Sequence, residues 1–516
     1  MTIIPTVTNT PTIHWFRQDL RLADNPALTA AAASGNPVLP VFVWQDGGGA
    51  GKPSPSASPT FRSPGGASRW WLHHSLAALS AQIAAMGGRL LLLDGDASPA
   101  KQLAALAAAV GAKQITFNHV YDAAGQADAH ELAQLMQAAG GKAQGFDGNL
   151  LYPPGTVRTG NGGFFQVFTP FWRALLALGD IPAPLPIPRS LSWAPPPEEL
   201  ASAQLADWHL LPTRPNWAAG FDDQWQPGEV GAQQRLASFI EGALADYDRR
   251  RDVPGGITTS RLSPHLRWGE ISPRQLYQRL QELLHAGRMD ADIAWKKPID
   301  KFLSEVGWRE FAYQLLVTNP DLANRPLRPA FAHFPWREDA TLLQAWQRGQ
   351  TGYPIVDAGM RELWTTGWQH NRVRMITASF LVKHLLQPWQ LGEDWFWDTL
   401  VDADAASNPA SWQWVAGCGA DAAPYFRIFN PMLQGSQFDA DGLYVRRWVP
   451  ELARLPNAYL HQPWTAPEKV LNAVGIRLGH DYPHPIVDHA QARGRALSAF
   501  ASISGTPQAL PERIEG

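Results

Sequence analysis

The N-terminal part of the chain alternates short apolar runs with longer segments of helical pattern. Ala- and Leu-rich stretches such as SRWWLHHSLAALSAQIAAMG and SPAKQLAALAAAVG separate the runs. Continuous apolar runs are typical of strands that are buried on both faces, and helices commonly connect parallel strands. The pattern therefore predicts a Rossmann-like parallel α/β domain over residues 1–150. Its strands are expected at 12–17, 37–44, 89–95 and 114–121, with a weaker fifth at 143–151.

The remainder of the chain divides into two parts by pattern. Residues 151–227 become rich in Pro and Trp after position 181 and lose clear periodicity, which predicts a long connector that runs over a surface. From 228 to 516 the apolar positions recur at helical spacing, as in PRQLYQRLQELL and VRMITASFLVKHLL. This region is predicted to be an all-α domain.

Composition narrows the function classes. The 516 residues are 17% charged and 45% hydrophobic, as in globular proteins, and the net charge of -3 means that any nucleic-acid surface must be local. One cysteine, Cys418, excludes an internal disulfide and any multi-cysteine metal site, and we expect no metal. No apolar run approaches the ~20 residues of a membrane span, and no secretory signal is visible. We expect a cytoplasmic monomer.

The run VDADAASNPASWQWVAGCGADAAPYFRIFNP, residues 401–431, concentrates polar and aromatic side chains. Asp402, Asp404 and Asn408 suit a ligand that forms many hydrogen bonds. Trp412 and Trp414 are separated by one residue, so they cannot point the same way in a helix or a strand. One of them can face an internal cofactor while the other faces an outer cavity.

Two other segments have candidate chemistry. YDRRRDVPGGITTSRLS, residues 247–263, combines arginines, a glycine pair and hydroxyls before a helix, which suits phosphate binding. In SEVGWREF, Glu305 and Trp308 lie one helical turn apart, so a carboxyl and an indole could stack on and hydrogen-bond a flat base. Taken alone, a solvated basic loop and an ordinary amphipathic helix are the favoured explanations of the two segments.

A third segment, GWQHNRVRMITASF at 367–380, places Asn371, Arg374 and Met375 on one helical face. Arg372 is rotated away from that face. An inward arginine requires a carboxylate, because an unpaired buried charge is costly.

Together with HWFRQDLRLADNPAL at 14–28, these segments resemble the photolyase/cryptochrome family, and most closely the bacterial class I and class III cyclobutane pyrimidine dimer photolyases. The resemblance implies an antenna α/β domain joined to a helical FAD-binding domain. It implies light-driven repair of UV-damaged DNA, in which excited FADH⁻ transfers an electron to a flipped-out dimer.

The resemblance also assigns site residues. FAD contacts are implied at Tyr247, Thr259, Ser260, Arg261, Leu262, Ser263, Asn371, Arg374, Asp402, Ala403, Asp404 and Asn408. Contacts with DNA or the dimer are implied at Arg251, Glu305, Trp308, Arg309, Asn371, Arg372, Met375 and Trp414. Arg374 is expected to pair with Asp402, and Glu305 to bond the dimer.

Asn408 and three tryptophans refine this assignment. Photolyases place Asn beside flavin N5, whereas plant cryptochromes place Asp and insect cryptochromes place Cys. An amide exchanges no full proton near neutral pH, so it favours reduction to FADH⁻. Trp412, Trp389 and Trp336 match the family's electron-transfer chain from the flavin to the surface.

Three alternatives remain at this point. A cryptochrome photoreceptor would share the fold and the flavin without repair. A (6-4) photolyase would require a pair of catalytic histidines that is missing here, and a single-strand-specific photolyase is weakly disfavoured. A nucleotide-binding α/β protein would bind no flavin. The antenna could be a folate or a deazaflavin, although Ala124 and Gly125 occupy the positions of the Asn-Glu pair in the Escherichia-type folate site.

Overall fold

The computed structural model describes residues 10–45, 61–95, 97–197, 202–287, 295–422 and 427–504. They form two compact, discontinuous units. The first unit comprises 1–248, 259–320 and 401–404, and the second comprises 249–258, 321–400 and 405–516. The predicted division at residues 150 and 227 follows the sequence order and stays a prediction.

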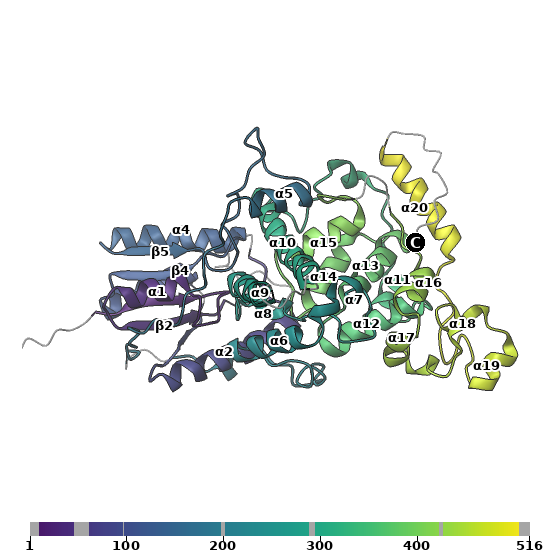
Figure 1. Ribbon diagram of the computed structural model, residues 1–516, viewed down its shortest axis with the longest axis horizontal. Helices are drawn as coiled ribbons and strands as arrows, with labels where there is room; N and C mark the ends of the chain where they lie inside the picture. The colour runs from purple at the N-terminus through teal and green to yellow at the C-terminus, as the bar shows by residue number, and fades with distance from the viewer. Residues whose placement is uncertain are drawn as a thin grey trace, which may run out of the picture. The chain divides into compact units, whose positions relative to one another are not determined.

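A five-stranded parallel sheet organises the first unit (Figure 1), in the order β3-β2-β1-β4-β5. The sheet confirms the predicted strands, including the weaker fifth. The strands are β1 (Thr12–Phe16), β2 (Val38–Val43), β3 (Leu91–Leu93), β4 (Gln114–Asn118) and β5 (Lys142–Phe146). The helices between them are α1 (Pro26–Ala33), α2 (Gly66–Ala85), α3 (Pro99–Val110) and α4 (Ala123–Ala138).

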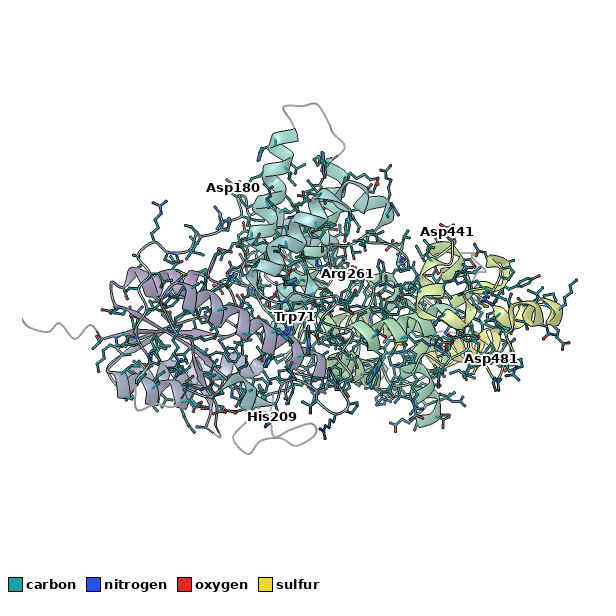
Figure 2. The ribbon with its side chains drawn as sticks, turned by 90° about the horizontal axis from the view of Figure 1, so that it is seen from below. Trp71, Asp180, His209, Arg261, Asp441 and Asp481 are labelled. Carbon is teal, nitrogen blue, oxygen red and sulfur yellow. The ribbon has the colours of Figure 1, made fainter. Side chains whose placement is uncertain are left out.

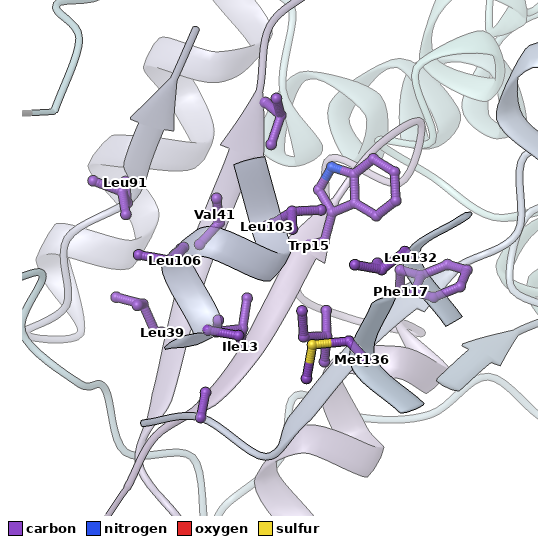
Figure 3. Close-up of a cluster of buried hydrophobic side chains, with 14 of the residues drawn as sticks. Ile13, Trp15, Leu39, Val41, Leu91, Leu103, Leu106, Phe117, Leu132 and Met136 are labelled. Atoms are coloured by element: carbon purple, nitrogen blue, oxygen red, sulfur yellow. The ribbon is translucent and has the colours of Figure 1, made fainter. Parts of the chain in front are cut away.

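Alternate residues of the strands build the main core of the sheet. Ile13 and Trp15 of β1 meet leucines of α3 and α4 on one face (Figure 3). Thr12, His14 and Phe16 point to the opposite face and are fully buried as well. Burial on both faces is what parallel strands require, and it explains the continuous apolar runs in the sequence.

The motif at 14–28 forms a buried network of hydrogen bonds in the first unit. Arg21 is fully buried, and its guanidinium donates to the carbonyl oxygens of Asp24, Gly148 and Gly269 at 2.6–3.1 Å. Asp24 accepts from the Ser272 hydroxyl at 2.5 Å. The motif therefore joins the sheet to residues 269–272, which connect two helices of the same unit.

Helices complete the first unit after the sheet. The predicted connector itself carries α5 and a short 3-10 helix, η1. The helical elements are α5 (Phe168–Leu176), η1 (Leu205–Trp208), α6 (Glu229–Glu241), η2 (Leu244–Asp246), α8 (Ser263–Arg267), α9 (Pro273–Gly287) and α10 (Lys296–Thr318). Helix α7 (Tyr247–Arg250) spans the boundary of the two units.

The regular elements described in the second unit are helices, as predicted, apart from an isolated β-bridge between Leu478 and Tyr482. Its longer helices are α11 (Ala340–Gln347), α12 (Pro354–Thr366), α13 (Asn371–Ser379), α14 (Trp389–Thr399), α15 (Ser407–Ala416), α16 (Pro431–Phe438) and α20 (His489–Ser504). Shorter elements are η4 (Pro329–His333), α17 (Leu443–Trp448), η6 (Pro450–Leu452), α18 (Asn457–Leu460), η7 (Pro463–Thr465) and α19 (Glu468–Val474).

One helical prediction differs in detail. The segment VRMITASFLVKHLL was expected to be a regular helix, but α13 ends at Ser379 and a π-helical turn follows at Phe380–His384. No helix in the part of the chain that the structure describes combines the length and the hydropathy of a bilayer span.

Candidate functional site

The segment Thr259–Ser263 presents its polar groups from a tight turn in the first unit (Figure 2 labels Arg261). Arg261 has a φ of 51°, the left-handed region that costs a non-glycine residue on the order of 1–2 kcal/mol. The Leu262 N–H donates to Ser260 Oγ at 3.3 Å, and the exposed Ser263 begins α8. Strained backbone of this kind is typical of ligand-binding turns.

Positive charge gathers beside this turn. The Arg261 guanidinium donates to Gln224 Oε1 at 3.3 Å. Burial, and then the Arg261 charge, lower the pKa of Arg235 in α6. A second cation next to Arg261 strengthens the attraction of the turn for an anion such as a diphosphate.

Residues 402–404 form a short, buried polar segment in the same unit. Asp402 and Asp404 are 8% and 5% exposed. The Tyr313 hydroxyl donates to Asp404 Oδ2 at 2.7 Å, and Arg267 Nε donates to the carbonyl oxygen of Ala403 at 2.6 Å. Burial and the Asp404 charge raise the pKa of Tyr313, so its hydroxyl remains a donor. Sequence reasoning missed Tyr313 and Arg267, because nothing in the sequence places them near residue 404.

Helix α10 holds Glu305 and Trp308 one turn apart, as predicted. Glu305 Oε1 lies 3.1 Å from Lys301 Nζ, and its side chain is 27% exposed. The Trp308 ring stacks on Phe168 with centroids 4.0 Å apart and an interplanar angle of 10°. Phe168 therefore covers one face of the indole and fixes its orientation.

Two other predicted residues of the first unit have internal roles. Arg309 donates to the carbonyl oxygens of Asn149 at 2.7 Å and Leu266 at 3.3 Å. These bonds favour a structural role over the predicted DNA contact. Tyr247 is 6% exposed and packs edge-on against Phe239 and Phe302.

Helix α13 arranges the predicted cationic residues of the second unit. The Arg372 N–H donates to the buried His370 ring at 3.2 Å, which caps the helix. Arg374 Nε donates to the carbonyl oxygen of Gln369 at 2.7 Å. Asn371 is exposed and Met375 is half-buried. The predicted pair of Arg374 with Asp402 would join residues of different units and stays a prediction.

Asn408 lies in the first turn of α15 and is oriented by Glu393, a fully buried residue that sequence reasoning missed. Asn408 Nδ2 donates to Glu393 Oε1 at 2.8 Å and to the Glu393 carbonyl oxygen at 3.0 Å. The amide donors are used in this way, so the acceptor Oδ1 is the group that Asn408 offers to a ligand. Glu393 follows no recognisable motif, and only the fold brings it to Asn408.

The tryptophans of the second unit differ in burial. Trp412 and Trp389 are 2% and 1% exposed, whereas Trp336 is half-buried and packs on Phe334 with centroids 4.3 Å apart. Trp412 fits closely against Gly392, where an added Cβ would lie 2.1 Å from the indole. Trp414 turns away as predicted, and its Nε1 donates to the carbonyl oxygen of Asp421 at 3.1 Å.

The donor set fits a flavin dinucleotide. The first unit offers hydroxyls and a strained turn beside arginines for a diphosphate, and buried carboxylates for hydroxyl groups. Arg267 Nη1 is buried and has no hydrogen-bond partner among the described atoms. The second unit offers an oriented amide and an arginine. Thr259–Ser263, Asp402 and Asp404 in the first unit have the chemistry that the predicted FAD contacts require, and so do Arg374 and Asn408 in the second unit.

Comparisons with known proteins agree with this chemistry. A family model described as DNA photolyase matches residues 12–189, and one described as the FAD binding domain of DNA photolyase matches residues 302–502. The deoxyribodipyrimidine photo-lyase of Agrobacterium fabrum is 49% identical over 496 residues, which cover 96% of this chain and 98% of that protein. Cryptochrome-1 of Arabidopsis thaliana is 38% identical over 95% of this chain and 70% of its own length.

A solved structure extends the comparison to three dimensions. A bacterial class III photolyase from Agrobacterium tumefaciens has a TM-score of 0.90 at 48% identity, over 98% of this chain and 100% of its own. The matches cover the sheet, the helical region and the segments that carry the site residues. The chain therefore belongs to the photolyase/cryptochrome family, and it is a photolyase that carries an FAD-binding domain.

Proposed function

We propose that the protein uses blue light to split cyclobutane pyrimidine dimers in DNA. The observation that carries the proposal is the outer face of α10, where Glu305 and Trp308 stand one turn apart and Phe168 fixes the indole. A flat ring beside a carboxyl suits a lesion that must be stacked and hydrogen-bonded at once. Similarity to named photolyases over the full chain supports the same chemistry.

The protein residues bind and orient the reactants. FAD, when bound and reduced, would supply light-driven one-electron chemistry to the lesion. Trp308 stacks on the flipped-out dimer. Glu305 hydrogen-bonds the polar edge of the dimer through its carboxyl O–H, which donates to a carbonyl oxygen and so stabilises the negative charge that appears there. Asn408 would offer its Oδ1 to a flavin N–H, because its own donors are bound to Glu393.

The remaining predicted contacts serve DNA binding. Arg251 and Arg372 belong to the second unit, and their side chains are 14% and 19% exposed. Their guanidinium groups contact phosphates and position the DNA strand. The contacts of Glu305 and Trp308 with the dimer make the protein select damaged DNA. A dimer is already partly unpaired, so flipping it out costs less than flipping an intact base.

Three tryptophans form the proposed path for reduction. Trp412 and Trp389 are buried and Trp336 reaches the surface, which is the burial gradient that a relay needs. Indoles have an accessible one-electron oxidation, so electrons can pass inward through them. Trp346 is fully buried beside Trp412, with centroids 6.2 Å apart, and offers a side branch that the sequence did not indicate.

A second, light-harvesting chromophore also stays a proposal. At the position where the Escherichia-type folate site has an acidic residue, an added Cβ on Gly125 would lie 2.8 Å from Val120. Arg17 also donates to the Gly125 carbonyl oxygen at 3.1 Å. A folate or deazaflavin antenna would therefore need contacts other than the Asn-Glu pair.

The test uses purified, chemically reduced protein and an oligonucleotide that carries one cyclobutane thymine dimer. We expect intact thymines to return in blue light and not in darkness, measured by chromatography of the digested strand. A protein that binds and photoreduces flavin without restoring thymines would contradict the proposal. That outcome would favour a cryptochrome-type photoreceptor, because the chain is also similar to a plant cryptochrome.

A further inference from the structure

A single carboxylate joins the two arginines assigned to DNA binding. Asp252 Oδ2 lies 2.9 Å from Arg372 Nη2, and Asp252 Oδ1 lies 3.7 Å from Arg251 Nε. All three residues belong to the second unit, and Asp252 is 31% exposed. The bond to Arg372 spans 120 positions of the sequence and ties the basic loop to α13.

Arg372 is also fixed from its other sides. Its guanidinium carbon lies 4.3 Å from the centre of the Phe438 ring, at the end of α16. Its backbone N–H is bound by His370 at the start of α13. The Arg372 side chain is thus held in place before any DNA strand binds. Its guanidinium pairs with Asp252, whereas in a DNA complex it would pair with a phosphate.

We propose that Asp252 is an internal substitute for a DNA phosphate and limits the affinity of the protein for DNA by competing for these two arginines. The proposal rests on the proposed function, because it takes Arg251 and Arg372 as phosphate contacts. A carboxylate offers two oxygens to two guanidinium groups, much as a phosphate does. A phosphate must therefore displace Asp252 or share the arginines with it.

This competition acts on both kinds of DNA through the same contacts. Intact DNA binds mainly through phosphates, so its affinity bears the cost of displacing Asp252. Damaged DNA pays the same cost and gains additional free energy from its contacts with Glu305 and Trp308, which do not depend on Asp252. The carboxylate therefore lowers both affinities by a similar factor, and the preference for damaged DNA, a ratio of the two affinities, is set by the lesion contacts.

The test is Asp252→Asn, which keeps the shape and removes the charge. Affinities for an intact duplex and for the same duplex with one thymine dimer are measured by fluorescence anisotropy between 50 and 200 mM NaCl. We expect binding of the intact duplex to tighten roughly three- to tenfold at the lowest salt. The slope of log affinity against log salt should steepen by about 0.9, one released counterion. Binding of the damaged duplex should tighten by a similar factor, so the preference for it should stay the same.

Asp481→Asn is the matched control, because it changes the net charge equally in the same unit (Asp481 is labelled in Figure 2). Asp481 pairs with Arg477 and His480 and touches neither DNA-facing arginine. We expect less than a twofold effect from this variant. Flavin absorbance and the melting temperature report whether each variant remains folded.

Two results would overturn the inference. An unchanged affinity and salt slope in Asp252→Asn would show that the carboxylate does not compete with phosphate. Weaker binding of both duplexes would show that Asp252 only holds the arginine face together. Failure of the proposed function is seen separately, since Arg372→Gln would then leave DNA binding intact and the wild-type protein would not repair the dimer.

Discussion

Two arginines from the motifs of this chain, Arg21 and Arg372, have different surroundings in the fold. Arg21, from the motif at 14–28, is fully buried, and backbone carbonyl oxygens receive most of its hydrogen bonds. Arg372, from α13, is partly exposed and pairs with one carboxylate. Carbonyl groups of the fold cannot move to make way for a ligand, whereas a carboxylate at the surface can be replaced. The kind of hydrogen-bond partner therefore distinguishes an arginine that stabilises the fold from one that can bind a ligand.

The same contrast occurs within α10. Glu310 is buried, and its Oε2 accepts from the Leu151 N–H at 3.0 Å, while Glu305 lies five residues earlier at the surface beside Lys301. One carboxyl belongs to the interior of the first unit and the other is available to a substrate. Variants of these four residues test the contrast between structural and binding side chains.

Replacing Arg21 by Met should lower the free energy of unfolding by about 3–5 kcal/mol, because several buried carbonyl groups lose their donor at once. Arg372→Met, with a partly exposed ion pair, should change it by less than about 1 kcal/mol. Urea unfolding followed by circular dichroism measures both. Equal losses in the two variants would end the distinction between the motifs.

Glu310 should make stability depend on pH. Burial raises the pKa of Glu310 from 4.5 to about 7, so the folded state binds a proton that the unfolded state has lost between these values. Its contribution to stability therefore falls by roughly 3 kcal/mol as the pH rises through this window. Glu310→Gln should remove that dependence. Urea unfolding of the wild-type protein and of the variant at pH 5 and pH 7 measures this dependence. If the free energy of unfolding differs between the two proteins by the same amount at both pH values, the dependence does not come from Glu310.

Glu305→Gln should retain bound FAD but lower the repair yield per absorbed photon roughly tenfold, equivalent to about 1.4 kcal/mol. The reason is that the carboxyl no longer offsets charge on the dimer. Glu282→Gln in α9 removes an exposed carboxyl that pairs with Arg279 and should leave the yield unchanged. If Glu305→Gln repairs as well as the wild type, Glu305 has no part in the chemistry.

Trp336→Phe should have the smallest structural effect, because the side chain is half-buried. Photoreduction of the oxidised protein should slow severalfold, while repair by chemically reduced protein continues. Transient absorption and the repair assay give the two rates. Loss of both activities together would show that Trp336 serves the fold and not the relay.

Local pattern was sufficient for the strands and most helices. The strands of the sheet followed from continuous apolar runs, and the position of Glu305 one turn from Trp308 on α10 followed from helical spacing. Partners distant in sequence could not be predicted. Arg21 meets Gly269 across 248 positions, and Arg372 meets Asp252 across 120. Nor does any spacing rule indicate that Glu393 orients Asn408.

The most direct test compares two lesions on one enzyme. Chemically reduced wild-type protein receives equal doses of blue light with an oligonucleotide that carries either a cyclobutane thymine dimer or a (6-4) product, and dark samples accompany each. We predict light-dependent restoration of thymines from the cyclobutane dimer and none from the (6-4) product. Restoration of the (6-4) product alone, or of neither lesion, would contradict the assignment of Glu305, Trp308 and Asn408 to cyclobutane dimer repair.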